Sequence, residues 1–254
     1  MPAAAKPPDP SATRPADSVP GSSAMGWSRG FKRVGGGSAL ALAILVCGLA
    51  AVVRHQPAFY GQRMAVAHGL GQEVSARRLV SDLSALRSAV ERPGDWEAAI
   101  DEDDINAWLA TDLERNHRGL LPGMVSEPRV RLTPRRIEVG WRLGAGLFST
   151  VAWATAEVRL REPNQLAIVL EDVRLGGLPL PRGPILAEIA RRCRPLGVVT
   201  VPRPLDGRSG LVCSIPSKHG EGGPSHWLES FSIGEGTIAV SGRTVHGSER
   251  PPAR

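Results

Sequence analysis

The chain has 254 residues, enough for one or two domains, and its 31 basic and 25 acidic residues give a formal charge of +6 at pH 7. Basic and acidic side chains are interleaved after residue 70, so no continuous basic stripe points to nucleic acid, and we expect no nucleic-acid partner. The modest positive excess is more compatible with an anionic membrane surface.

A long apolar run near the N-terminus predicts a membrane anchor. Residues 1–34 are rich in Pro, Ala and Ser and lack apolar periodicity, which predicts a disordered cytoplasmic tail. Residues 35–54 include the uncharged run from Ser38 to Val53, close to the roughly 20 residues that a membrane-spanning helix needs. More basic residues precede this run than follow it. The N-terminus is therefore expected in the cytoplasm and the remainder of the chain outside it.

Two alternatives stay open for this segment. The sequence Gly48-Leu49-Ala50 offers the small residues that signal peptidase requires, so the run could be a cleaved signal peptide instead of an anchor. Met25 is a plausible start as well, because the chain from there reads as a compact export signal. Each alternative leaves the remaining domain outside the cytoplasm.

Residues 55–243 are expected to form one extracytoplasmic α+β domain, followed by a disordered tail at 244–254. Residues 56–72 suggest a broken helix next to the membrane. Apolar residues recur at 3.6-residue spacing over 73–90, which predicts an amphipathic helix. Alternation over 96–100 predicts a short strand after it.

Four adjacent acidic residues, Asp101 to Asp104, precede the next predicted helix. Such a cluster could bind Ca²⁺, but the ligands of a calcium loop normally alternate around a glycine. The better interpretation is that Asp101 caps the helix while the other carboxylates meet the positive end of its dipole. Ile105, Trp108 and Leu109 would then pack inward.

From residue 128 onward the hydrophobic period changes from helical to two, which predicts strands joined by short turns. Pro184 opens a second amphipathic helix that ends near residue 192, and a proline-rich passage follows it. The fold class is therefore α+β: an N-terminal transmembrane helix, then an antiparallel β-meander curled around amphipathic helices. The predicted strands lie near residues 130–132, 137–143, 148–161, 166–175, 211–215, 228–233 and 237–240.

No nucleotide-binding, hydrolase or zinc motif occurs in the sequence. His219 and His226 flank a Ser/Gly loop, where a Ser–His catalytic pair is less favoured than solvated histidines. We therefore expect no catalytic residues, no metal and no cofactor. Cys193 and Cys213 would face an oxidising compartment after export, which permits a disulfide, but two free thiols are the favoured interpretation.

Three short motifs stand in a characteristic order along the chain: Ile105-Asn106-Ala107 after the acidic turn, Gly177-Leu178-Pro179-Leu180-Pro181 after the meander, and a last strand from Ile233 to Gly242. With the anchor and the long helix, this layout resembles bacterial single-pass membrane proteins of the YpmS-like type, whose domains are similar to tubular lipid-binding modules. The resemblance implies a curled sheet around a helix, with an apolar groove.

On this resemblance, the chain is expected to bind a membrane lipid or another amphiphile in that groove without catalysis. The alternative is a structural or interaction protein of the cell envelope, with a filled core, an exposed apolar patch and envelope proteins as partners. Plain core packing would demand the same apolar side chains. The candidate groove residues are Leu83, Leu86, Trp108, Leu109, Val139, Trp141, Val151 and Trp153.

Overall fold

The computed structural model describes residues 44–65, 70–146, 149–217 and 224–245. The chain divides into two compact units, Met1–Val46 and Cys47–Arg254. Residues 44–46 of the first unit and 47–53 of the second are helical. Within the described ranges, no helix combines the length and the apolarity that crossing a membrane requires. The predicted tail at 1–34 and residues 35–43 of the predicted anchor lie outside those ranges.

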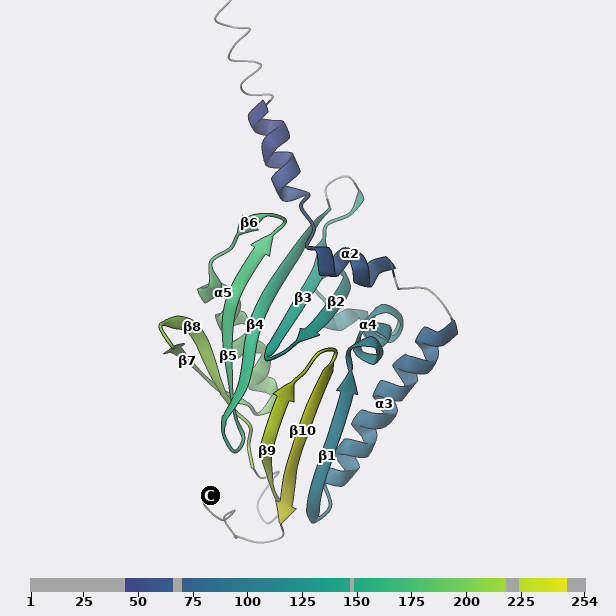
Figure 1. Ribbon diagram of the computed structural model, residues 1–254, viewed down its shortest axis with the longest axis vertical. Coiled ribbons are helices and arrows are strands. Elements are labelled where there is room, and N and C mark those ends of the chain that lie inside the picture. Colours follow the sequence, from purple (N-terminus) through teal and green to yellow (C-terminus); the bar gives the residue numbers. More distant parts are fainter. Residues whose placement is uncertain (1–43, 66–69, 147–148, 218–223, 246–254) are drawn as a thin grey trace, which may run out of the picture. The chain divides into compact units, whose positions relative to one another are not determined.

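The second unit is built on two antiparallel sheets (Figure 1). The larger sheet has seven strands in the order β2-β3-β4-β5-β8-β7, with the short β6 paired to β5, and the smaller sheet has the order β1-β10-β9. The strands are β1 Gly94–Asp101, β2 Val125–Thr133, β3 Arg136–Leu143, β4 Thr150–Glu162, β5 Gln165–Leu175, β6 Leu178–Pro179, β7 Val199–Leu205, β8 Arg208–Ser214, β9 Ser225–Ile233 and β10 Thr237–Val245.

The predicted α+β class and antiparallel meander are confirmed for β2 to β5, which pair in chain order. Strand β7 was missed because Pro202 and Pro204 interrupt its pattern, yet it lies at the sheet edge, where proline is tolerated. The separate small sheet was not foreseen either. It pairs β1 with β10 from the far end of the chain.

The C-terminal strand continues beyond its expected end. Residues 244–254 were predicted to be a tail, but β10 extends to Val245, and Thr244 is buried. The hydroxyl of Thr244 accepts a hydrogen bond from Trp96 Nε1 at 3.2 Å and donates one to the Val90 carbonyl at 2.8 Å. These contacts join β10 to β1 and to the preceding helix, so residues 244 and 245 belong to the folded domain.

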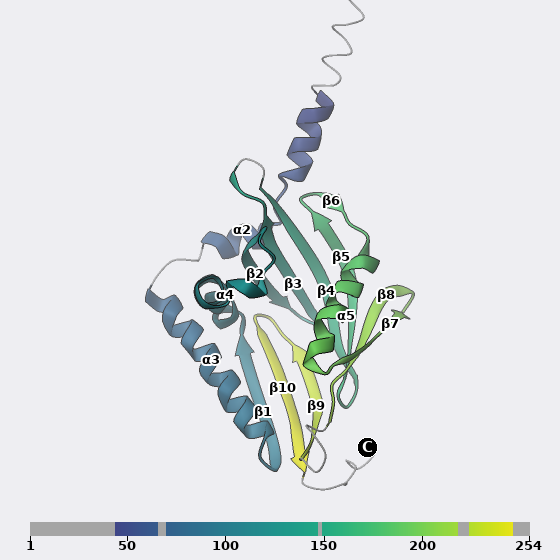
Figure 2. The ribbon, with the colours of Figure 1, turned by 180° about the vertical axis from the view of Figure 1, so that it is seen from behind.

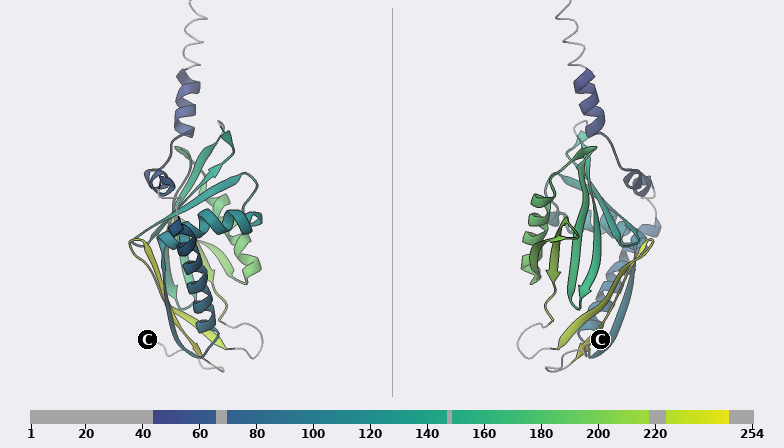
Figure 3. Two further views of the ribbon diagram at one scale, coloured as in Figure 1. Left: turned by 90° about the vertical axis from the view of Figure 1, so that its right-hand side faces the viewer. Right: turned by 60° about the vertical axis from the view of Figure 1, so that its left-hand side comes forward.

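The helices cover different parts of the two sheets (Figure 2). α3 packs against α4 and β1, whereas α5 packs against β5, β7 and β8. Helix α2 and helix α5 lie on opposite sides of the large sheet (Figure 3). The helices are α2 Ala58–Ala65, α3 Leu70–Val90, α4 Glu102–Asn116 and α5 Arg182–Cys193, with short 3₁₀ turns at Arg118–Leu120 and Arg194–Leu196.

Both faces of the large sheet are covered in part. The inner face, defined here as the face under α5, carries a cluster of Leu170, Leu186 and Leu211 and a second cluster around Leu132. The outer face, under α2, carries Phe59, Tyr60 and Val151. Gly140 is required beneath α2, because an added Cβ would lie 2.7 Å from the Tyr60 ring.

Candidate functional site

The strand register decides where the predicted groove residues lie. Residues paired directly in an antiparallel ladder project from the same face of the sheet. Val139 pairs with Ala154 and Trp141 with Ala152, and Ala154 packs under α5, so Val139 and Trp141 lie on the inner face.

Val151 and Trp153 lie on the opposite, outer face, because they pair with Arg142 and Gly140. Val151 is buried in the cluster under α2. The Trp153 indole donates a hydrogen bond to the Gly176 carbonyl at 3.1 Å, and the Arg174 guanidinium lies 5.6 Å from the centre of its ring. The expectation that all four strand residues share one groove is therefore wrong.

The predicted helical residues are also divided. Leu83 is 44% exposed and Leu86 is half-buried on α3, which packs against α4 and β1. On α4, Trp108 lies 5.9 Å from the His117 ring. Leu109 follows Ile105 by one turn, and Ile105 packs against the inner-face cluster. Of the eight candidates, Leu109, Val139 and Trp141 therefore remain candidates for one common surface.

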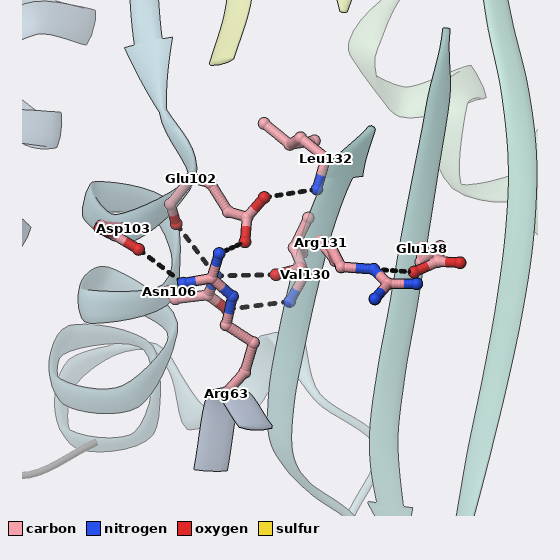
Figure 4. Close-up of polar contacts among 8 residues, drawn as sticks. All are labelled: Arg63, Glu102, Asp103, Asn106, Val130, Arg131, Leu132 and Glu138. Carbon is pink, nitrogen blue, oxygen red and sulfur yellow. Dashed lines mark hydrogen bonds and ion pairs between the residues drawn. The ribbon is translucent and has the colours of Figure 1, made fainter. Parts of the chain in front are cut away.

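The described chain has a second, polar site at the start of α4, which was not predicted (Figure 4). The site contains four buried polar residues: Glu102, Asp104, Asn106 and Arg129. We call this group of residues the α4 pocket.

Two side chains of α4 bind the edge strand β2. A Glu102 carboxylate oxygen accepts the N–H of Leu132 at 2.6 Å, and Asn106 Oδ1 accepts the N–H of Val130 at 2.9 Å. Asn106 Nδ2 donates to the Val130 carbonyl at 2.8 Å and to the Glu102 carbonyl at 3.0 Å. Because Glu102 and Asn106 are four residues apart on one helix face, they replace a neighbouring strand and close this edge of the sheet.

Arg63 of α2 reaches the same helix start. Its guanidinium forms an ion pair with the buried Glu102 and another with the exposed Asp103, at 2.6 Å. Asp104 lies 3.8 Å from Arg78 of α3. These pairings compensate buried carboxylates that would otherwise be costly to remove from water.

The predicted cap at Asp101 is only half correct. Asp101 occupies the N-cap position of α4, but its side chain makes no capping hydrogen bond. Its carboxylate accepts a hydrogen bond from the Thr237 hydroxyl at 3.2 Å. The four acidic residues thus turn to different partners, and among the described residues no three acidic, His or Cys side chains converge to hold a metal ion.

Two adjoining cavities open at the α4 pocket. The first has a volume of about 160 Å³ and is lined by Arg63, Gln72, Ser75, Asp103 and Arg129, among others. A second, of about 270 Å³, shares Arg63, Ser75 and Asp103 with it and extends along the acidic turn. The carboxylates here are already paired, so the groups left for a ligand are mainly hydrogen-bond donors.

A buried tyrosine adjoins this site on the outer face. The Tyr60 hydroxyl donates to the Glu127 carbonyl at 2.9 Å. Burial, reinforced by the Glu127 carboxylate, raises the pKa of Tyr60 to about 12, against a weaker lowering by Arg142 and Arg129. Tyr60 therefore stays neutral and acts as a hydrogen-bond donor.

The sequence held one usable signal for this site. The four-residue spacing of Glu102 and Asn106 could have suggested a shared helix face. Arg129 could not have been found, because an arginine beside the inward-facing Val130 of a strand reads as solvent-exposed. Comparison with protein families, with curated protein sequences and with solved structures yields no match for this chain. The resemblance to the YpmS-like type stays a prediction.

Proposed function

We propose that the chain is a single-pass membrane protein, anchored through residues 35–54, whose domain outside the cytoplasm binds a lipid or another amphiphile without catalysing a reaction. The observation that carries the binding proposal is the state of the inner face. Val139 and Trp141 are large apolar side chains that are only half-buried, and neither belongs to the four buried clusters of the described residues. Ligand sites are lined mainly by apolar and aromatic side chains, so these two residues are available to contact an acyl chain.

The anchor proposal is supported by the helical residues 47–53. Leu49 and Val52 are exposed apolar side chains on this helix. The end of the helix is tied to the domain, since the Gly177 N–H donates to the Val52 carbonyl at 2.8 Å and the Thr150 hydroxyl donates to the Val53 carbonyl at 2.5 Å. These bonds satisfy carbonyls that a helix end leaves open, and they hold Val52 and Val53 to the rest of the second unit.

A photoreactive fatty acid tests the binding site directly. The full chain in detergent is incubated with this probe and irradiated, and the labelled peptides are mapped by mass spectrometry. We expect label on β3 at Val139 and Trp141, and its loss in Trp141→Glu, because a buried carboxylate disfavours an acyl chain on this face. Val201→Glu, an exposed position elsewhere, is the matched control and should keep the label. Label confined to residues 35–54 in the wild type and in Val201→Glu would refute the proposed binding site at Val139 and Trp141.

One observation favours the alternative, an interaction protein of the cell envelope. Leu196, Val199 and Val201 are 75%, 63% and 53% exposed, and the two valines lie on the edge strand β7. An exposed apolar strip of this kind is typical of a protein contact. If it is one, the double variant Val199→Glu and Val201→Glu should lose its cross-linked envelope partners in cells, while fatty-acid labelling of the inner face should not change.

A further inference from the structure

Arg129 is a buried cation without a counter-ion among the described residues. Arg129 is 4% exposed and lies on the outer face of the edge strand β2. Nη1 donates to the carbonyl of Pro128 at 2.7 Å, and Nε has no acceptor. The carboxylates around it are engaged by other arginines: Glu102 and Asp103 by Arg63, Glu127 by Arg142, and Glu138 by Arg131.

A buried guanidinium with an unsatisfied N–H costs free energy unless another group accepts its hydrogen bonds. The two adjacent arginines of the sheet show the usual solution. Arg131 pairs with Glu138 across the strands, and Arg142 pairs with Glu127 at 2.5 Å. Arg129 lines a cavity instead of meeting a carboxylate, so the cavity is where its partner would bind.

The cavity of about 160 Å³ beside Arg129 offers further donors. Arg63 lines it from α2, and Gln72 and Ser75 line it from the start of α3. The N-terminal end of this 21-residue helix carries the positive end of the helix dipole, which favours anions. Asp103 is the acidic residue in the lining, and its charge is already compensated by Arg63 at 2.6 Å.

We propose that this cavity binds a phosphate-type oxyanion, either free phosphate or the phosphate of a lipid headgroup, with Arg129 as its principal ligand. A tetrahedral oxyanion presents oxygens in several directions and can accept bonds from α2, α3 and β2 at once, and guanidinium groups match its geometry. The proposal does not depend on amphiphile binding at Val139 and Trp141, which lie on the other face of the sheet.

The test is a titration of the full chain, in dodecyl maltoside micelles at pH 7.5, with inorganic phosphate at constant ionic strength. Binding is followed by calorimetry and by the melting temperature. We expect saturable binding and a rise in melting temperature with wild type. Arg129→Met should weaken phosphate affinity at least tenfold, because it removes the principal ligand.

A second variant guards against misfolding of the first. Gln72→Glu places a carboxylate in the cavity near the start of α3, where acidic residues stabilise a helix. It should raise the melting temperature without phosphate and weaken phosphate binding at least tenfold, because it supplies Arg129 with an internal partner. Arg131→Met is the matched control: it lies two residues away on the same face but does not line the cavity, so it should bind phosphate like wild type.

A phosphate effect no larger than that of chloride at equal ionic strength, or one retained in both Arg129→Met and Gln72→Glu, would overturn the proposal. Loss of binding in these two variants alone supports it. Mixed micelles containing phosphatidylglycerol then identify the source of the oxyanion. If they weaken phosphate binding relative to lipid-free dodecyl maltoside micelles, the site takes a lipid headgroup; if phosphate binding is the same in both, it takes free phosphate.

Discussion

Asn106 should be one of the costliest polar side chains to remove, because it holds α4 against the edge of the large sheet. Its amide makes three hydrogen bonds, at 2.8, 2.9 and 3.0 Å, two of them to the main chain of Val130. At about 1 kcal/mol net for each bond, Asn106→Ala loses about 3 kcal/mol. The better helix propensity of alanine returns roughly 0.5 kcal/mol. The expected loss of about 2.5 kcal/mol lowers the melting temperature by roughly 5–10 °C.

Thermal unfolding of the full chain in detergent, followed by far-ultraviolet circular dichroism, measures this loss. Asn116→Ala is the matched control, since Asn116 is exposed on the same helix and its side chain donates to the Asp112 carboxylate at 2.6 Å. It should change stability by less than about 0.5 kcal/mol. Equal melting temperatures for the two variants would refute the idea that α4 closes the sheet edge.

Asn106→Asp sharpens the test through pH. Aspartate keeps the acceptor for the Val130 N–H but loses the donor, and its carboxylate would face the carbonyl oxygens of Val130 and Glu102. The folded protein therefore favours the protonated acid, so the pKa of the new carboxyl is expected to rise. A raised folded pKa contributes stability at low pH that is lost as pH increases. Asn106→Asp should thus be less stable than Asn106→Ala at pH 7 and recover towards pH 4.

Three further outcomes follow from single contacts. Gly176 has φ +60°, and an added Cβ would lie 2.2 Å from the Val53 carbonyl oxygen. Gly176→Ala should therefore detach the helix that ends at Val53 and speed proteolysis just after it. The melting temperature of the domain should change little. Tyr60 is the chain's single tyrosine, so near-ultraviolet absorbance reports tyrosine ionisation at this residue alone. Because its folded pKa of about 12 exceeds the ordinary value of 10, its contribution to stability should be full below pH 10 and fall by on the order of 2 kcal/mol from pH 10 to 12. Tyr60→Phe should lack this fall. Burial and the neighbouring Cys193 thiol raise the pKa of Cys213 to about 11, so alkylation of Cys213 at pH 8 should be slow in the folded chain. The oxidant diamide should convert the two thiols to a disulfide, which intact mass spectrometry detects as the loss of two hydrogens. An unchanged mass would place the thiols out of reach of each other.

Local patterns in the sequence were sufficient for most individual elements. Alternation over residues 137–143 predicted β3, and 3.6-residue spacing over 73–90 predicted most of α3. Periodicity is a local property, because a strand or a helix must bury one side wherever it packs. The short turns between β2 and β5 likewise made antiparallel pairing the natural arrangement.

The pairing register between strands could not be predicted from such patterns. Val139 and Trp141 alternate along β3 just as Val151 and Trp153 do along β4, but odd-numbered residues of β3 pair with even-numbered residues of β4. The two pairs therefore face opposite sides of the sheet. Shifting the register by one residue would reverse this outcome, and the register depends on the loop and the packing around it, which no alternation within either strand records.

The α4 pocket and the small sheet were decided by tertiary structure alone. β1 pairs with β10, which is separated from it by the whole large sheet in sequence, so no local pattern could join them. Arg129 alternates with the inward-facing Val130 and would be solvent-exposed on an isolated strand; it is buried because α2, α3 and α4 meet over this edge. Sequence periodicity determined which elements form, and packing between distant elements determined which charges are taken out of water.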